Sequence, residues 1–88
     1  MRDATTNDPV ALALRALTAT LADQRLAERF LSLSGIGPPD LRQRAADPTL
    51  LVALLVFLEA HEPDLIAVAE EIGVKPEALV IARQELEQ

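Results

Sequence analysis

The residues best equipped for acid–base or metal chemistry surround the single histidine of the chain. His61 lies beside the carboxylates of Glu59, Glu62 and Asp64. An imidazole next to carboxylates could act as a general base or bind a divalent metal. Catalytic zinc sites usually draw on further His or Cys ligands, and the chain has one His and no Cys. We therefore expect His61 to cap the end of a helix, and we expect no catalytic residue, metal site or cofactor.

The serines and glycines of segment 32–37 give no stronger sign of catalysis. Gly35-Ile36-Gly37 follows an expected helix, whereas phosphate-binding loops follow a strand and carry a third glycine. Ser32 and Ser34 have no histidine nearby in the sequence to activate a hydroxyl group as a nucleophile. The sequence therefore predicts a protein that is not an enzyme.

Residues 65–87 resemble a DNA-binding helix-turn-helix, because Gly73-Val74 lies between two amphipathic segments. A recognition helix needs surrounding Lys and Arg side chains that neutralise phosphates. In this segment Lys75 and Arg83 are outnumbered by glutamates. A nucleic-acid-associated regulator is therefore the alternative interpretation and not the preferred one.

Two groups of exposed charges are candidate interaction surfaces. The basic group flanks the corner at residues 35–39 and consists of Arg25, Arg29, Arg42 and Arg44. It could meet an acidic protein or RNA, although acidic residues are interleaved with it. The acidic group lies in the last third of the chain and consists of Glu70, Glu71 and Glu77. It could bind a basic partner.

The formal net charge of −6 is concentrated at the C-terminal end. Residues 1–58 contain six acidic and six basic residues, whereas residues 59–88 contain eight acidic residues and two basic ones. This end should repel phosphate backbones and anionic lipids, so the charge disfavours nucleic-acid and membrane partners.

Prolines and glycines mark where the helices should begin and end. Pro residues follow Asp8, Asp47, Glu62 and Lys75, as is typical of a first helical turn, and Gly35 and Gly73 fit helix ends. The first helix carries an apolar stripe of Val10, Leu14, Leu17 and Leu21, and the second a stripe of Leu26, Phe30 and Leu33. No Gly or Pro separates these two segments, so a single kinked helix is an open alternative.

The segment from about residue 48 to 60 is apolar nearly all round, which indicates a buried central helix or an interface. Its candidate core or dimer-face residues are Leu51, Leu54, Leu55, Phe57 and Leu58. No segment shows the alternation of a strand. We expect an all-α, compact bundle of five or six short helices around this central helix, with a flexible polar tail at 1–7 and one domain at 8–88.

The order of these corners and helices resembles a family of small bacterial helical proteins described as a domain of unknown function. The resemblance rests on Phe30-Leu31-Ser32-Leu33-Ser34-Gly35-Ile36, Asp47-Pro48, the apolar helix 50–57, and Gly73, Pro76-Glu77 and Ala82. It implies an all-helical fold, and it implies no activity and no functional residues.

These observations favour a non-catalytic protein–protein interaction module. The partner would be an unidentified protein or a second copy of the chain, because the apolar surface of helix 48–60 exceeds what a small bundle easily covers. The first residues lack the apolar segment of a secretory signal, and no apolar run reaches the length of a membrane span, so we expect a cytoplasmic location.

Overall fold

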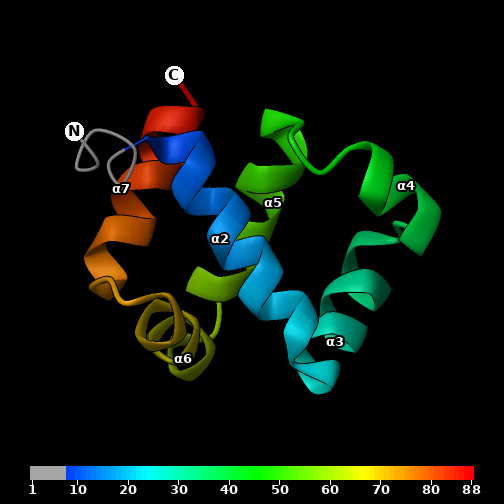
Figure 1. Ribbon diagram of the computed structural model, residues 1–88, viewed down its shortest axis with the longest axis horizontal. Coiled ribbons are helices and arrows are strands. Elements are labelled where there is room, and N and C mark those ends of the chain that lie inside the picture. Colours follow the sequence, from blue (N-terminus) through cyan, green and yellow to red (C-terminus); the bar gives the residue numbers. More distant parts are fainter. Residues whose placement is uncertain (1–7) are drawn as a thin grey trace.

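The computed structural model describes residues 8–88, and these residues form six α-helices joined by short turns (Figure 1). The helices are α2 (Pro9–Ala22), α3 (Gln24–Ser34), α4 (Pro38–Gln43), α5 (Pro48–Glu59), α6 (Glu62–Ile72) and α7 (Pro76–Leu86). The described residues contain no strand, so the prediction of an all-α bundle is confirmed. The tail expected at residues 1–7 lies outside the described part of the chain.

Aspartate and proline together start two of the helices. The carboxylates of Asp8 and Asp47 accept hydrogen bonds from the backbone N–H groups of Val10 and Thr49, each at 2.9 Å. Each aspartate satisfies one of the amides that have no partner inside the helix, and the proline that follows lacks an N–H group there. The helix starts predicted at these positions are confirmed.

Asp23 separates α2 from α3, which settles the question of one kinked helix or two. Its backbone is extended, with φ −98° and ψ 112°, so the helical path is interrupted at this residue. Its carboxylate accepts hydrogen bonds from the N–H groups of Arg25 at 3.0 Å and Leu26 at 3.2 Å. The same residue therefore ends one helix and caps the next.

Glycines end α3 and α6 in the left-handed conformation. Gly35 has φ 72° and Gly73 has φ 78°, values that cost glycine little because it has no Cβ atom. After Gly73 the chain turns back, and the N–H of Val74 donates to the carbonyl of Ala69 at 2.9 Å. This bond satisfies one of the last carbonyls of α6 and directs α7 back onto the bundle.

Helix α5 is the buried centre of the bundle (Figure 1) and contacts α2, α3, α6 and α7. Leu51, Leu54, Leu55 and Leu58 are fully buried and Phe57 is nearly so. These five residues therefore form core within a single chain and are not open to a second copy. The prediction of a buried central helix over about 48–60 is confirmed, and the interpretation of these residues as a dimer face is wrong.

The apolar stripes predicted for α2 and α3 are partly wrong. The buried face of α2 consists of Leu12, Ala13, Ala16, Leu17 and Thr20. Two small alanines lie on this face and let α2 pack closely against its neighbours, whereas Leu21 at the helix end is exposed. On α3, Leu33 is exposed although Leu26 and Phe30 are buried. No helix within residues 8–88 has the combined length and apolar character of a membrane span.

Candidate functional site

A groove with mainly apolar walls lies between α3 and α5. The two helices run in opposite directions here (Figure 1), and the groove has a volume of about 430 Å³. Its lining residues are Arg29, Phe30, Leu33, Ser34, Ala53, Val56, Phe57, Ala60 and His61. Leu33 on α3 and Val56 on α5 are 75% and 47% exposed as whole residues. The groove therefore presents large aliphatic groups to solvent from both of its walls.

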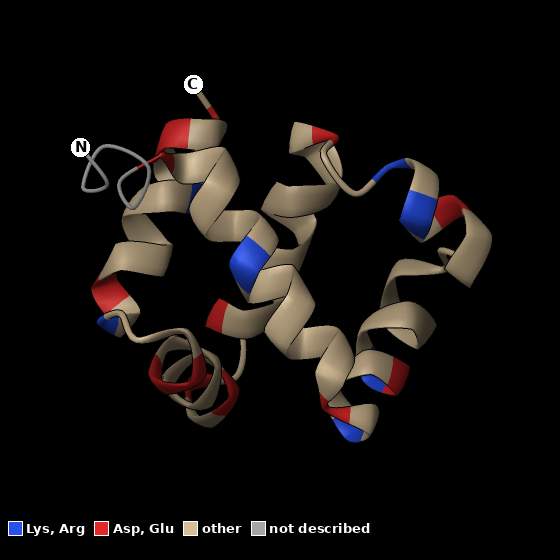
Figure 2. Cartoon of the chain, in the orientation of Figure 1, with Lys and Arg blue, Asp and Glu red and all other residues tan. Residues whose placement is uncertain are grey.

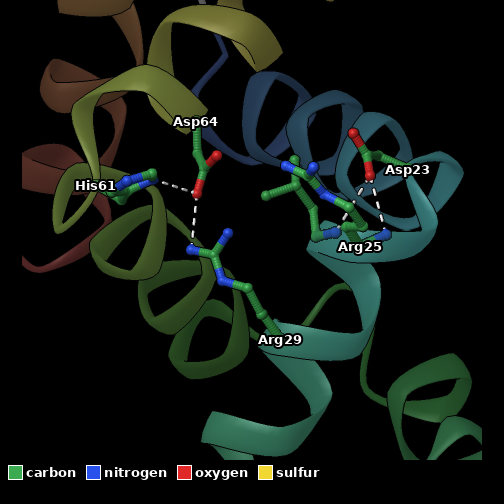
Figure 3. A network of polar contacts seen from close by, with 6 residues as sticks. Asp23, Arg25, Arg29, His61 and Asp64 are labelled. Atoms are coloured by element: carbon green, nitrogen blue, oxygen red, sulfur yellow. Dashed lines mark hydrogen bonds and ion pairs between the residues drawn. The ribbon is translucent and has the colours of Figure 1, made fainter.

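An ion-pair cluster beside the groove joins α3 to the start of α6 (Figure 3). Nη2 of Arg29 donates to Oδ2 of Asp64 at 2.8 Å, and Nδ1 of His61 lies 2.8 Å from the same oxygen atom. The side chain of Asp64 is only 11% exposed, whereas those of Arg29 and His61 are 43% and 55% exposed. The carboxylate of Asp64 is thus largely enclosed, whereas the Arg29 guanidinium and the His61 imidazole that contact it are about half exposed.

The pKa of the Asp64 carboxyl reflects opposing influences. Burial disfavours the charged form and would raise the pKa. The hydrogen bonds and positive charges of His61 and Arg29 together outweigh burial, and the pKa of Asp64 is lowered below its ordinary value. Asp64 is therefore ionised at neutral pH and holds Arg29 and His61 beside the groove.

The floor of the groove belongs to the hydrophobic core. Phe30 and Phe57, the only aromatic residues of the chain, pack with ring centroids 5.4 Å apart and an interplanar angle of 58°. The guanidinium carbon of Arg29 lies 5.3 Å from the centroid of the Phe57 ring, within the range of a cation–π contact. The position of Arg29 is therefore set by a core side chain as well as by Asp64.

Replacing Asp64 by asparagine should lower the free energy of unfolding by about 1 kcal/mol at neutral pH, because it removes charge-assisted hydrogen bonds whose partners are half exposed and screened. Since folding lowers the pKa of Asp64, its stabilising effect is complete above the ordinary value of 3.8. The effect is lost as the pH falls through the lower pKa of the folded state. Urea unfolding of the wild type and Asp64→Asn at neutral pH and at pH about 3 measures this difference.

The matched control for this prediction is Glu70→Gln, which neutralises an exposed carboxylate on the same helix. It should change stability by less than about 0.5 kcal/mol at either pH. If the difference between wild type and Asp64→Asn were the same at both pH values, Asp64 would not be the charged centre of the cluster.

The predicted arginine patch is divided between two places, so its interpretation as one surface is wrong. Figure 2 shows the basic residues of α3 near the beginning of that helix, and those of α4 and the following turn well apart from them. Arg29 binds Asp64, and Nε of Arg44 lies 3.5 Å from Asp47. Arg25 and Arg42 are exposed. The separation arises because residues 30–34 of α3 and the corner after it lie between the two pairs.

The acidic candidates lie on the surface of α6 and at the start of α7, and Figure 2 shows acidic residues on both helices. Glu70, Glu71 and Glu77 are exposed. The structure gives no partner for them, and their role in binding a basic protein stays a prediction.

The carboxylates around His61 do not converge on the imidazole. Glu59 accepts two hydrogen bonds from Arg83, at 2.9 and 3.1 Å, and only Asp64 binds His61. Residues 8–88 contain no group of three or more His, Asp or Glu side chains that could hold a metal ion. His61 occupies the N-cap position of α6 without a side-chain cap hydrogen bond there, and the role expected of it at the end of α5 stays a prediction. The His61 side chain instead contacts the carboxylate of Asp64, which lies three residues later in the first turn of α6.

The helix-turn-helix-like segment corresponds to α6 and α7, and Arg83, one of its two basic residues, is engaged in ion pairs. Leu79 and Ala82 of α7 are buried, and α7 packs against α2 and α5. Arg83 pairs with Glu59 and Glu87, and the hydrogen bonds that it donates to these carboxylates raise its pKa above the ordinary value. The exposed residues of α7 are Glu77, Ile81, Gln84 and Glu85. Of the two basic residues of this segment, Lys75 at the N-cap of α7 is exposed, and these glutamates lie on the helix that it precedes.

Residues 6–88 match the family described as "Protein of unknown function (DUF3572)". The chain belongs to this family. The match to DUF3572 spans all the described helices, so the resemblance seen in the sequence is confirmed. Neither the curated proteins nor the solved structures gave a match to the chain. Because DUF3572 carries no assigned activity, function has to be argued from the geometry of the site.

Sequence reasoning named Arg29, Phe57 and His61 as candidates but did not predict the groove that joins them to Leu33 and Val56. It placed Leu33 on a buried stripe, and it treated Arg29 and Asp64 as parts of unrelated groups although the structure brings them together. One feature of the sequence that could have indicated the groove was the excess of apolar residues in helix 48–60. A helix that is apolar all round exposes some of its side chains in a small bundle, and Val56 is such a residue.

Proposed function

We propose that this protein is a non-catalytic interaction module that holds an amphipathic helix of a partner protein in the groove between α3 and α5. One observation carries the proposal. Among the described residues, two of the three most exposed large apolar side chains, Leu33 and Val56, line this same groove. Exposed apolar groups that gather in one concave place favour binding to another surface, whereas scattered ones need no explanation.

The shape of the groove suits a helix better than an extended strand. Its walls are two helices, and the described residues offer no sheet edge to which a strand could add. In helix-in-groove recognition the partner inserts apolar side chains spaced three or four residues apart. Phe30 and Phe57 already pack together beneath the groove, so little ordering of the module would accompany binding.

A partner protein is favoured over a second copy as the occupant. The apolar residues of α5 that suggested a dimer are buried within one chain, and Val56 alone of its large apolar residues is exposed. Sedimentation equilibrium of the purified protein over a range of concentrations distinguishes the two occupants, because a protein that stays monomeric at every concentration would contradict the homodimer.

The cytoplasmic location expected from the sequence stays a prediction.

The proposal is tested by comparing two substitutions of exposed aliphatic residues. Leu33→Ser alters the groove, whereas Ile81→Ser alters α7, where Ile81 is 52% exposed and lies outside the groove. The wild type and both variants are immobilised and incubated with extract of the cells that make the protein. Bound proteins are then quantified by mass spectrometry.

We expect one bound protein to be retained by the wild type and by Ile81→Ser, and to be reduced at least about tenfold on Leu33→Ser. Equal retention by all three would show that binding occurs elsewhere. Circular dichroism of the variants establishes that each keeps its helices, since exposed substitutions should change stability by less than about 0.5 kcal/mol.

A further inference from the structure

The groove between α3 and α5 differs in charge from three other hollows of the described surface. Its ionisable lining residues are Arg29 and His61, and no carboxylate lines it. Three other hollows each include an acidic side chain, contributed by Asp23 and Glu71, by Glu71, and by Glu28. The chain has 14 acidic and 8 basic residues. In this groove, a carboxylate of a ligand can nevertheless approach without contacting an acidic side chain of the lining.

Arg29 and His61 have hydrogen-bonding capacity beyond what the cluster uses. A guanidinium group carries five N–H donors, and the hydrogen bonds found within residues 8–88 use only Nη2 of Arg29. His61 meets Asp64 through Nδ1, which leaves Nε2 as its other ring nitrogen. Both side chains are about half exposed. Arg29 can therefore donate to a ligand without giving up Asp64, and His61 can do so through Nε2 when its imidazole is protonated.

Asp64 acts in this arrangement as a positioning residue. Its enclosed Oδ2 atom contacts both the Arg29 guanidinium and the His61 imidazole (Figure 3), and so positions these two side chains relative to each other. The Phe57 ring beside the Arg29 guanidinium restricts it further. A pair of donors held in this way loses little conformational entropy when it binds an anion.

We infer that the partner helix carries an Asp or Glu side chain whose carboxylate binds Arg29 and His61, while its apolar side chains lie between Leu33 and Val56. This inference rests on the proposed function and specifies the chemistry of the partner. Arg29 and Leu33 are one turn apart on α3, a rise of about 6 Å. The acidic residue of the partner should therefore lie three or four positions from an apolar one.

Two matched helical peptides of about 15 residues test this inference. Both consist of Ala, Gln and Lys with a stripe of Leu, and they differ at one position, one turn from a Leu, which is Glu in one peptide and Gln in the other. Acetylated N-termini and amidated C-termini ensure that the Glu side chain is the only carboxylate. Affinities are measured by fluorescence anisotropy with the full-length wild type, Arg29→Gln, Arg29→Lys and Leu33→Ser.

The wild type should bind the Glu peptide about threefold to tenfold more tightly than the Gln peptide. Arg29→Gln should abolish this preference, and Arg29→Lys should keep part of it, since lysine retains the charge but lacks the planar donor group. Leu33→Ser should weaken the binding of both peptides. In NMR spectra, the Nε–H signal of Arg29 should shift with the Glu peptide more than with the Gln peptide.

Equal affinity for the two peptides, with both weakened by Leu33→Ser, would overturn the carboxylate inference and leave the groove as the binding surface. A preference for Glu that persists in Arg29→Gln would also overturn it. Binding of neither peptide, or binding insensitive to Leu33→Ser, would contradict both the inference and the proposed function.

Discussion

Truncation of Leu54 to alanine is expected to lower the free energy of unfolding by about 2–5 kcal/mol. Leu54 is fully buried on the central helix α5, so the substitution removes apolar contacts and leaves a cavity that the surrounding helices fill only in part. For a domain of this size the loss corresponds to a fall in Tm of at least about 10 °C. Urea unfolding followed by circular dichroism measures it.

Val56→Ala is the matched control, because Val56 lies on the same helix but is exposed in the groove. Its truncation should cost less than about 1 kcal/mol. A large loss for Leu54→Ala with a small loss for Val56→Ala would agree with the burial pattern of α5. Similar small losses for both would mean that α5 does not form the core as described.

Truncation of Phe57 to alanine is expected to have a comparable effect on stability, about 3–5 kcal/mol. Phe57 is nearly buried and packs against Phe30, and its ring also lies beside the guanidinium of Arg29. The substitution therefore opens the core beneath the groove and removes one of the two contacts that position Arg29. Thermal and urea unfolding report the loss of stability.

Phe57→Leu separates the two roles of this side chain. Leucine keeps much of the apolar volume, so the loss of stability should be only about 1–2 kcal/mol. It has no ring face for Arg29, however, so the shift of the Arg29 Nε–H signal should reveal the changed contact in NMR spectra. An unchanged Arg29 signal in Phe57→Leu would contradict the cation–π contact.

The fold was largely predictable because its boundaries are set by local chemistry. Asp8-Pro9 and Asp47-Pro48 start helices through caps that involve neighbouring residues only, and Gly73 ends one through its own backbone freedom. The central helix was predictable because its apolar content leaves few alternatives to burial. The number of separate helices was less certain, since Asp23 interrupts the chain without any glycine or proline.

The candidate site was much harder to predict because it depends on contacts between distant segments. Arg29 and Asp64 are 35 positions apart, and nothing in the pattern near either residue indicates the other. The exposure of Leu33 was also hidden, because its spacing from Phe30 matches a buried stripe. Whether such a residue is covered depends on where the neighbouring helices lie, which periodicity alone does not specify.

The way α3 packs against the rest of the bundle links the fold to the proposed function. Helices α2, α5, α6 and α7 all contact one another, whereas α3 contacts α2 and, to a smaller extent, α5. The incomplete contact leaves the groove with its two exposed aliphatic side chains, and the Asp64 cluster lies beside it (Figure 3). The bundle can thus be stable by itself and still present an apolar surface to a partner.

The most direct test of the groove as a binding surface is site-specific photo-crosslinking in the cells that make the protein. A photoreactive amino acid replaces Leu33 in one variant and Ile81 in another, so that both probes are exposed but only the first lies in the groove. We predict a discrete crosslinked protein from position 33, absent from position 81 and lost when Val56→Asp is added. Crosslinks from position 81 alone, or the same products from both positions, would contradict the account.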